Sequence, residues 1–135
     1  LTLGGQGWSL YETLGGGQGA SANGPGASGR QVHMTNTRAT DPEVLERRLP
    51  LVVRRMALRK GSGGEGVHRG GDGLVRELEL TEPGGAALLC TRLGTGAEAE
   101  VRVDGRWRSW DGDPVALGAG DRVRVSTPGG EGWTG

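Results

Sequence analysis

The chain has 135 residues, of which 29 are glycine and 6 are proline, and it carries 16 basic and 16 acidic side chains. A formal net charge of zero gives no electrostatic footprint for nucleic acid, and the single cysteine, Cys90, excludes an internal disulfide. Because no stretch is apolar enough to span a bilayer or to act as a signal peptide, we expect no nucleic-acid partner, no membrane association and a cytoplasmic location.

The length suits one domain, but the hydrophobic core is predicted to be small. Hydrophobic residues make up 33% of the chain and phenylalanine is absent. The glycines gather between periodic segments instead of spreading evenly, which favours glycine-built loops on a β scaffold over a disordered chain. A scaffold of this kind would need packing contacts with a larger protein to be stable.

The first third of the chain is predicted to contain a hairpin, a long loop and a helix start. Apolar residues around a glycine pair in residues 1–14 are compatible with a hairpin. Residues 15–29 hold seven glycines and Pro25 without periodicity, which predicts a long loop of the kind that is usually functional or disordered. Asp41-Pro42-Glu43 predicts the start of a short helix that ends before Pro50, since Asp can cap the free amides and Pro is tolerated in the first turn.

Strands dominate the remainder. Residues 51–59 fit helix or strand by periodicity, and Val52-Val53 favours strand. In residues 74–80, leucines at 74, 78 and 80 share one face while Glu77 and Glu79 share the other. Residues 86–91 are predicted to form a buried strand, and residues 121–125 supply a last alternating one.

A further hairpin is predicted around Asp104-Gly105, a dipeptide typical of tight turns. A two-residue loop would pair Val103 with Arg106, whereas a three-residue loop would pair Val101 with Trp107. We expect the three-residue loop, because it keeps apolar side chains opposite each other. The sum is a mainly β fold, antiparallel and loop-rich, with one short helix.

The densest group of hydrogen-bonding side chains is the run His33-Met34-Thr35-Asn36-Thr37-Arg38. His33 is a candidate general acid/base, and Arg38 can grip a carboxylate with two hydrogen bonds. Asn36 and Thr37 are candidates for holding a substrate amide or carbonyl. The alternatives are a structural or metal-binding role for His33 and a salt bridge from Arg38 to Glu43 or Glu46.

A second candidate is the glycine run at Gly15, Gly16 and Gly17, where backbone amides could approach an anion closely. Glu12, just before it, is a candidate second carboxylate at the substrate. The alternative for the glycine run is a flexible surface loop, and the alternative for Glu12 is a solvated strand residue. The run is no Walker A loop, and His33, His68 and Cys90 are too scattered to predict a metal site.

The order of the motifs resembles the C-terminal part of the hydantoinase B/oxoprolinase family, closest to 5-oxoprolinase. The motifs are Tyr11-Glu12-Thr13-Leu14 with the glycines that follow, the polar run at 33–38, the glycine-rich strings 61–66 and 69–73, and the closing 127–133. The resemblance runs from about Leu10 to Gly135. Two departures stand out: Gln31 occupies the place of a usual second histidine, and a Gly/Pro-rich segment that normally follows Arg92 is missing.

The resemblance implies that residues 1–135 are a single unit, the C-terminal fragment of an ATP-dependent cyclic-amide hydrolase that opens a lactam or hydantoin ring. It implies that ATP is held by a separate A-type domain or subunit, so that this chain binds no cofactor itself. The expected partners are that A-type part, the remainder of the B-type domain and a small cyclic amide. Such a tail, or truncated gene product, would be inactive alone.

The alternative hypothesis is a non-catalytic β module, or a degenerate fragment, that completes the fold or binds a partner subunit. Gln31 and the missing segment favour this alternative for the isolated chain. An independent nucleotide-binding protein ranks last, because no complete phosphate motif is present. The sequence leaves open whether the substrate is oxoproline, a hydantoin or another compound.

Overall fold

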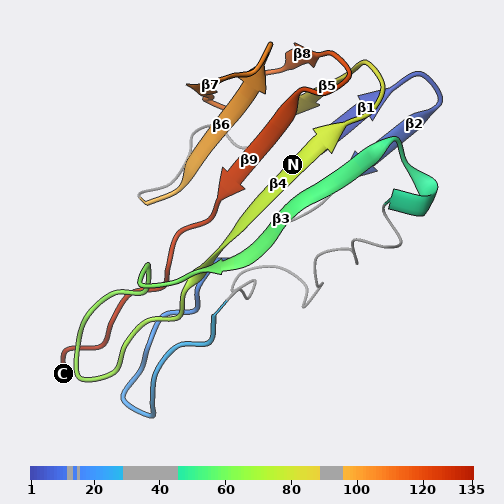
Figure 1. Ribbon diagram of the computed structural model, residues 1–135. Coiled ribbons are helices and arrows are strands. Elements are labelled where there is room, and N and C mark those ends of the chain that lie inside the picture. Colours follow the sequence, from blue (N-terminus) through green and yellow to red (C-terminus); the bar gives the residue numbers. More distant parts are fainter. Residues whose placement is uncertain (12–13, 15, 29–45, 89–95) are drawn as a thin grey trace.

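The computed structural model describes residues 1–11, 14, 16–28, 46–88 and 96–135, which form two antiparallel sheets and a glycine-rich extension (Figure 1). The described part also contains one short helical segment, residues 46–48. Among these residues, no helix has the length and apolar character needed to cross a membrane. The fold is therefore mainly β, as predicted.

The two sheets are built from nine strands in the described part of the chain. The larger sheet contains β3 (Leu51–Arg59), β4 (Gly73–Leu80), β9 (Arg122–Ser126), β6 (Glu98–Val103) and β7 (Arg106–Ser109), in the spatial order β3-β4-β9-β6-β7. The smaller sheet contains β2 (Trp8–Tyr11), β1 (Thr2–Gly5), β5 (Gly84–Ala87) and β8 (Val115–Leu117), in the order β2-β1-β5-β8. All pairings are antiparallel.

The sheets pack face to face around one hydrophobic cluster. Alternation directs Leu78 and Leu80 of β4 inward, and both are fully buried together with Leu3 of the smaller sheet. Val101 and Val123 are cross-strand neighbours on the same inner face and are also fully buried. Since the cluster takes side chains from both sheets, neither sheet could keep its apolar face dry without the other.

The glycine-rich extension consists of residues 16–28, 61–73 and 128–133, which lie together at the end of the molecule that carries the C-terminus (Figure 1). We call it the glycine bundle. Its segments are joined by backbone hydrogen bonds: the Gly17 amide donates to the Pro128 carbonyl at 2.9 Å, and the Gly71 amide donates to the Gln18 carbonyl at 2.8 Å. The Gly130 amide donates to the Gly71 carbonyl at 2.9 Å. The segments thus satisfy one another's backbone groups without forming a regular sheet.

Close approach of backbones explains why the bundle uses glycine. A Cβ atom added to Gly17 would lie 1.8 Å from the carbonyl oxygen of Gly71, and one added to Gly70 would lie 2.0 Å from that of Gly130. Both distances are far below contact distance, and the clashing atoms belong to the backbone and cannot rotate away. Side chains are therefore excluded from the interior of the bundle.

Most of the predicted elements are confirmed. The N-terminal hairpin is β1–β2, the strand over residues 51–59 is β3, and the alternating strand is β4. The helical residues 46–48 precede Pro50, whereas the predicted start at Asp41-Pro42-Glu43 lies outside the described residues. The predicted strand 86–91 is found as β5, which begins and ends earlier, and residues 89–91 lie outside the described part. The three-residue strand β8 was not predicted.

The predicted pairing of Val101 with Trp107 is wrong. The strands pair Val103 with Arg106 and Arg102 with Trp107, so the loop has two residues. Both of them have positive φ, 51° at Asp104 and 78° at Gly105, as in the turns whose twist matches that of paired strands. Trp107 needs no apolar partner across the hairpin, because its ring packs against the guanidinium of Arg124 at 4.0 Å.

Candidate functional site

Most of the predicted site lies outside the described residues. This holds for His33, Asn36, Thr37, Arg38, Glu12 and Gly15, and also for Cys90. The structure does describe Gly16 and Gly17 and the residues that flank the polar run, Ser28 before it and Glu46 after it. Glu46, one suggested partner of Arg38, accepts a hydrogen bond from the Val53 amide at 3.0 Å.

Gly16 and Gly17 lie in the glycine bundle. The Gly17 amide is engaged with the Pro128 carbonyl, and a Cβ atom on Gly16 would lie 2.8 Å from that same oxygen. The carbonyl of the next residue, Gln18, accepts from Gly71. These contacts give both glycines a packing role at the foot of the bundle, where it meets the sheets.

A carboxylate marks this junction between the bundle and the larger sheet. Asp72 Oδ1 accepts a hydrogen bond from the Gly63 amide at 2.9 Å. Together with smaller contributions from the amides of Gly61 and Ser62 and from the Arg69 guanidinium, that bond holds the pKa of Asp72 below its usual range, although desolvation works against it. The loop thus forms an anion-binding nest, and a carboxylate of the same chain occupies it.

Three hydroxyl groups complete the junction. Ser62 Oγ donates to the Arg59 carbonyl at 2.7 Å and accepts from the Gly73 amide at 2.9 Å. Ser28 Oγ accepts from the Asp72 amide at 2.8 Å, and Thr127 Oγ1 accepts from the Leu74 amide at 2.7 Å. Each hydroxyl satisfies a backbone group at the start of β4, so the junction is held by specific polar contacts.

A groove of about 700 Å³ lies beside the junction, and its lining includes Arg59, Lys60 and Glu131 together with the glycines of the bundle. The Arg59 guanidinium donates to the carbonyl oxygens of Gly96 and Thr127 and lies 3.6 Å from Glu98. Arg59 therefore ties the end of β3 to the loops around it. Because the described lining contains no histidine or cysteine, its chemistry is that of charge and backbone hydrogen bonding.

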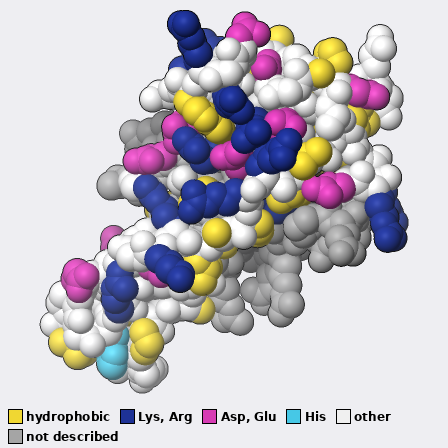
Figure 2. Space-filling view, viewed as in Figure 1, with side chains coloured by type: hydrophobic (Ala, Val, Ile, Leu, Met, Phe, Trp, Pro, Cys, Tyr) yellow, Lys and Arg dark blue, Asp and Glu magenta, His cyan; other side chains and the backbone are white. Residues whose placement is uncertain are grey.

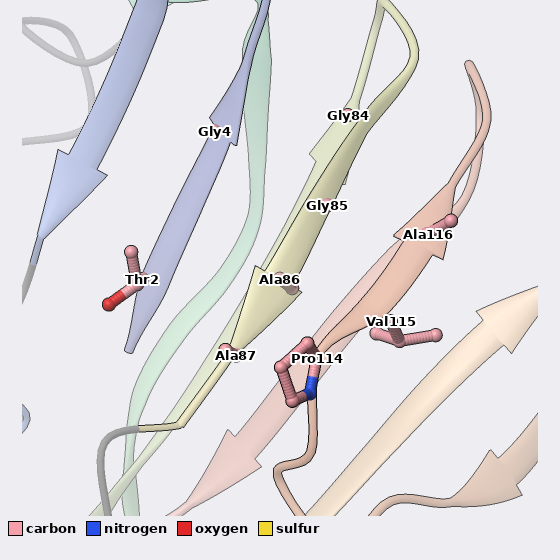
Figure 3. Close-up of a pocket in the computed structure, with 9 residues that line it drawn as sticks. All are labelled: Thr2, Gly4, Gly84, Gly85, Ala86, Ala87, Pro114, Val115 and Ala116. Carbon is pink, nitrogen blue, oxygen red and sulfur yellow. The ribbon is translucent and has the colours of Figure 1, made fainter.

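A second, smaller pocket of about 480 Å³ lies on β1, β5 and β8 (Figure 3). Its lining is made of small or apolar residues, namely Thr2, Gly4, Gly84, Gly85, Ala86, Ala87, Pro114, Val115 and Ala116. None of these side chains titrates, so this pocket offers no acid/base or nucleophilic group. Across the described residues, no group of three or more His, Cys, Asp or Glu is placed to hold a metal ion.

His68 has a structural environment at the far part of the bundle. Its backbone exchanges two hydrogen bonds with that of Trp133, at 3.3 and 2.9 Å, and the two rings lie 5.7 Å apart.

Arg76 is a residue that sequence reasoning missed. It lies between Leu74 and Leu78 on the inner face of β4, is 1% exposed, and directs Nη1 to Met56 Sδ at 3.2 Å. The sequence did contain a sign of this burial, because Arg76 occupies the position between Leu74 and Leu78 in the alternating pattern of inward-facing residues.

Taken together, the described residues form a two-layer β unit whose junction with a glycine bundle positions the chain on either side of the polar run. The hydantoinase B/oxoprolinase family model matches residues 1–135. The chain belongs to the hydantoinase B/oxoprolinase family.

Two relatives and two solved structures illustrate the similarity. The chain is 42% identical to 5-oxoprolinase 1 of Arabidopsis thaliana, with 98% of this chain and 12% of that protein covered. It is 37% identical to the 5-oxoprolinase PfmaA of Pestalotiopsis fici, with 94% of this chain and 11% of that protein covered. The chain thus spans about an eighth of the length of the Arabidopsis relative.

The solved structures share the fold at low identity. The ATP-dependent caprolactamase of Pseudomonas jessenii matches with a TM-score of 0.75 and 22% identity, over 90% of this chain and 24% of that one. Nucleotide-free acetone carboxylase matches with a TM-score of 0.67 and 16% identity, over 89% of this chain and 22% of that one. Hence the fold of most of this chain is shared with parts of these two larger proteins.

Proposed function

We propose that this chain supplies the C-terminal portion of an ATP-dependent cyclic-amide hydrolase of the 5-oxoprolinase type, acting in the cytoplasm on a lactam or hydantoin ring. The observation that carries the proposal is the 42% identity to Arabidopsis 5-oxoprolinase 1 over 98% of the chain. The names of both structural neighbours include ATP dependence, and one of them acts on a lactam.

In the proposed reaction, an A-type domain or subunit would bind ATP, whose γ-phosphoryl group would pass to the amide oxygen with release of ADP. Water then attacks the electrophilic carbon, the C–N bond breaks, and phosphate and the ring-opened acid are released. His33 serves as the acid/base that protonates the leaving nitrogen, and Arg38 holds the substrate carboxylate. Glu12, Gly15, Asn36 and Thr37 face the substrate.

The described residues take a positioning role in this proposal. Ser28, the last described residue before the polar run, accepts a hydrogen bond from the Asp72 amide at the junction. The glycine bundle fixes this point relative to β3 and β4, which are the strands that follow the run in the chain. In this proposal the ATP site and the rest of the B-type domain lie in other parts of the enzyme, so we expect this chain to be inactive by itself.

A chimera tests the proposal. The 12% of Arabidopsis 5-oxoprolinase 1 that matches this chain is replaced by the 135 residues, and phosphate and glutamate are followed with ATP and 5-oxoproline. We expect coupled release of both products by the chimera, and none by the isolated chain or by the relative with the segment deleted. A folded chimera that releases no glutamate would refute the proposed reaction.

The site residues are tested within the same chimera. His33→Ala and Arg38→Ala should lower kcat by about 10² to 10⁴, the usual loss when one positioned acid/base or clamp is removed. His68→Ala is the matched control, because the His68 ring lies against Trp133 in the bundle in a tilted arrangement, and it should leave kcat nearly unchanged. If His33→Ala retained kcat and lowered only the melting midpoint, the catalytic assignment would be withdrawn.

The second candidate is a non-catalytic β module that completes the fold. It is favoured by the Gly17 amide, which is bonded within the bundle, and by the internal carboxylate that fills the described anion nest. The same chimera separates the two functions. An active chimera whose His33→Ala and Arg38→Ala variants keep normal kcat would support the module, since the fold would then be needed and the polar run would not.

A further inference from the structure

The outer face of the larger sheet carries charged side chains of both signs, and Figure 2 shows Lys or Arg and Asp or Glu side chains close together on the molecular surface. In one row, Arg124 of β9 lies between Glu77 of β4 and Glu100 of β6. Arg124 Nη2 is 2.8 Å from Glu100 Oε2, and Arg124 Nη1 is 3.5 Å from Glu77 Oε1. Opposite charges on adjacent strands stabilise a sheet, so this row follows the expected pattern.

The adjacent row breaks the alternation. It begins with Glu79 on β4 and Arg122 on β9, with Arg122 Nε 2.9 Å from Glu79 Oε1. The next position, on β6, is Arg102, which is the register partner of Arg122. Among the described residues no carboxylate lies within ion-pair distance of Arg102. Two cations therefore face each other where the pattern requires an anion.

An aromatic ring borders the same place. Trp107 of β7 is the register partner of Arg102 on its other side, and the Arg124 guanidinium lies 4.0 Å from the centroid of the indole ring. Trp107 is partly buried, although it lies on an edge strand. We call the three residues Arg102, Arg122 and Trp107 the basic corner.

The basic corner keeps unused hydrogen-bond donors. Arg122 binds Glu79 through Nε and Glu77 through Nη1, and its Nη2 makes no hydrogen bond within the described residues. Arg102 makes none through its guanidinium in that part of the chain. A guanidinium has five donors arranged to match a carboxylate, so one carboxylate between the two arginines would be bound by both and would remove their repulsion.

We propose that the basic corner is a docking site for an acidic segment of a protein partner, with a glutamate or aspartate between Arg102 and Arg122 and an adjacent apolar side chain on Trp107. Three glutamates on the same face, at 77, 79 and 100, would repel the continuous charge of a nucleic acid or an anionic membrane. A single carboxylate beside an apolar group fits the geometry better. This surface is separate from the proposed reaction, and its test does not depend on activity.

The probe is the peptide acetyl-Gly-Leu-Glu-Glu-Leu-Gly-amide, titrated into the nitrogen-15-labelled chain at low salt while the indole N–H resonance of Trp107 is followed. We expect a saturable shift, and about tenfold weaker binding for the matched peptide with glutamine in place of both glutamates. Arg102→Ala should weaken binding of the acidic peptide by a similar factor. Arg106→Ala is the control, since Arg106 is an exposed arginine of the same hairpin that alternates to the other face.

In the peptide titration, any of these results would overturn the proposal: no saturable shift, equal binding of the two peptides, or equal weakening by Arg102→Ala and Arg106→Ala. Arg102→Glu provides a readout that a folding failure cannot imitate. It restores the alternation opposite Arg122, so it should raise the melting midpoint by about 1–4 °C while abolishing peptide binding. Arg106→Glu should do neither. If Arg102→Glu lowered the midpoint, the two arginines would not repel each other and the docking site would be rejected.

Discussion

The substitution Gly17→Ala tests whether the glycine bundle is a packed structure. A Cβ atom on residue 17 would lie 1.8 Å from the Gly71 carbonyl oxygen, which belongs to the backbone. The two segments must therefore separate by more than 1 Å, because real Cβ–oxygen contacts are about 3.4 Å or longer. Separation would break the bond from Gly17 to Pro128 and the bond from Gly71 to Gln18.

The adjacent bond from the Gln18 amide to Ala27, 2.7 Å long, would be weakened by the same movement. Two broken backbone hydrogen bonds and one weakened one, at about 1 kcal/mol for each full bond, give a loss of about 2–3 kcal/mol. For a chain of this size that corresponds to a fall in melting midpoint of about 10 °C. Urea and thermal unfolding followed by circular dichroism measure both quantities.

Gly4→Ala is the matched control. Gly4 also lies in extended backbone, but a Cβ atom added there would be no closer than 3.5 Å to its nearest neighbour. Alanine is more favourable than glycine in a strand by about 0.5–1 kcal/mol, so this variant should be as stable as the parent or slightly more stable. If Gly17→Ala were within about 0.5 kcal/mol of Gly4→Ala, the bundle would be loose and our explanation of its glycines would be wrong.

Two further predictions concern the junction and the hairpin. The pKa of Asp72 is lowered in the folded chain, so its stabilisation is fully present above the ordinary aspartate pKa of about 3.9 and is lost as the pH falls through the lower folded value. Asp72→Asn should therefore lower the free energy of unfolding at pH 7 and converge with the parent in acid. Asp113→Asn is the control and should follow the parent throughout, because the Asp113 side chain makes no ion pair within the described residues. Parallel curves of unfolding free energy against pH for Asp72→Asn and the parent would refute this. Gly105→Ala places a Cβ atom on a residue with a φ of 78° and should lower the free energy of unfolding in urea by about 1–2 kcal/mol. Asp104→Asn is the control and should be neutral, because asparagine tolerates positive φ. Equal losses for the two variants would contradict the two-residue turn.

The strands could be predicted because burial follows a simple period. The leucines at 78 and 80 alternate with Glu77 and Glu79, and the inner ones are fully buried while the glutamates join the ion pairs of the outer face. The same rule failed at Trp107, which was expected to seek an apolar partner. A ring on the outer face can instead pack on a guanidinium, and a pattern of hydrophobicity does not distinguish these two environments.

The glycine bundle could be located in the sequence but its packing could not. Glycine carries no side chain, so its positions show no hydrophobic period, and a run such as 15–19 is equally compatible with a flexible loop. What fixes the bundle is contact between backbones far apart in the chain, for example between Gly70 and Gly130. A single sequence does not contain that information, and the same limit applies to Arg76, whose burial depends on its neighbours in space.

The bundle also explains how a site in this chain could depend on residues that never touch a substrate. The amide of Gly71 donates a hydrogen bond to the carbonyl of Gln18, the residue after Gly17. The amide of Asp72 donates to the hydroxyl of Ser28, the last described residue before the polar run. Any side chain introduced between these segments moves Ser28 relative to β4. Positioned acid/base groups lose much of their effect when displaced by about 1 Å. In the active chimera, Gly17→Ala should therefore lower kcat together with stability, whereas Gly4→Ala should lower neither. A Gly17→Ala chimera that melts early but keeps full kcat at low temperature would uncouple the bundle from the site.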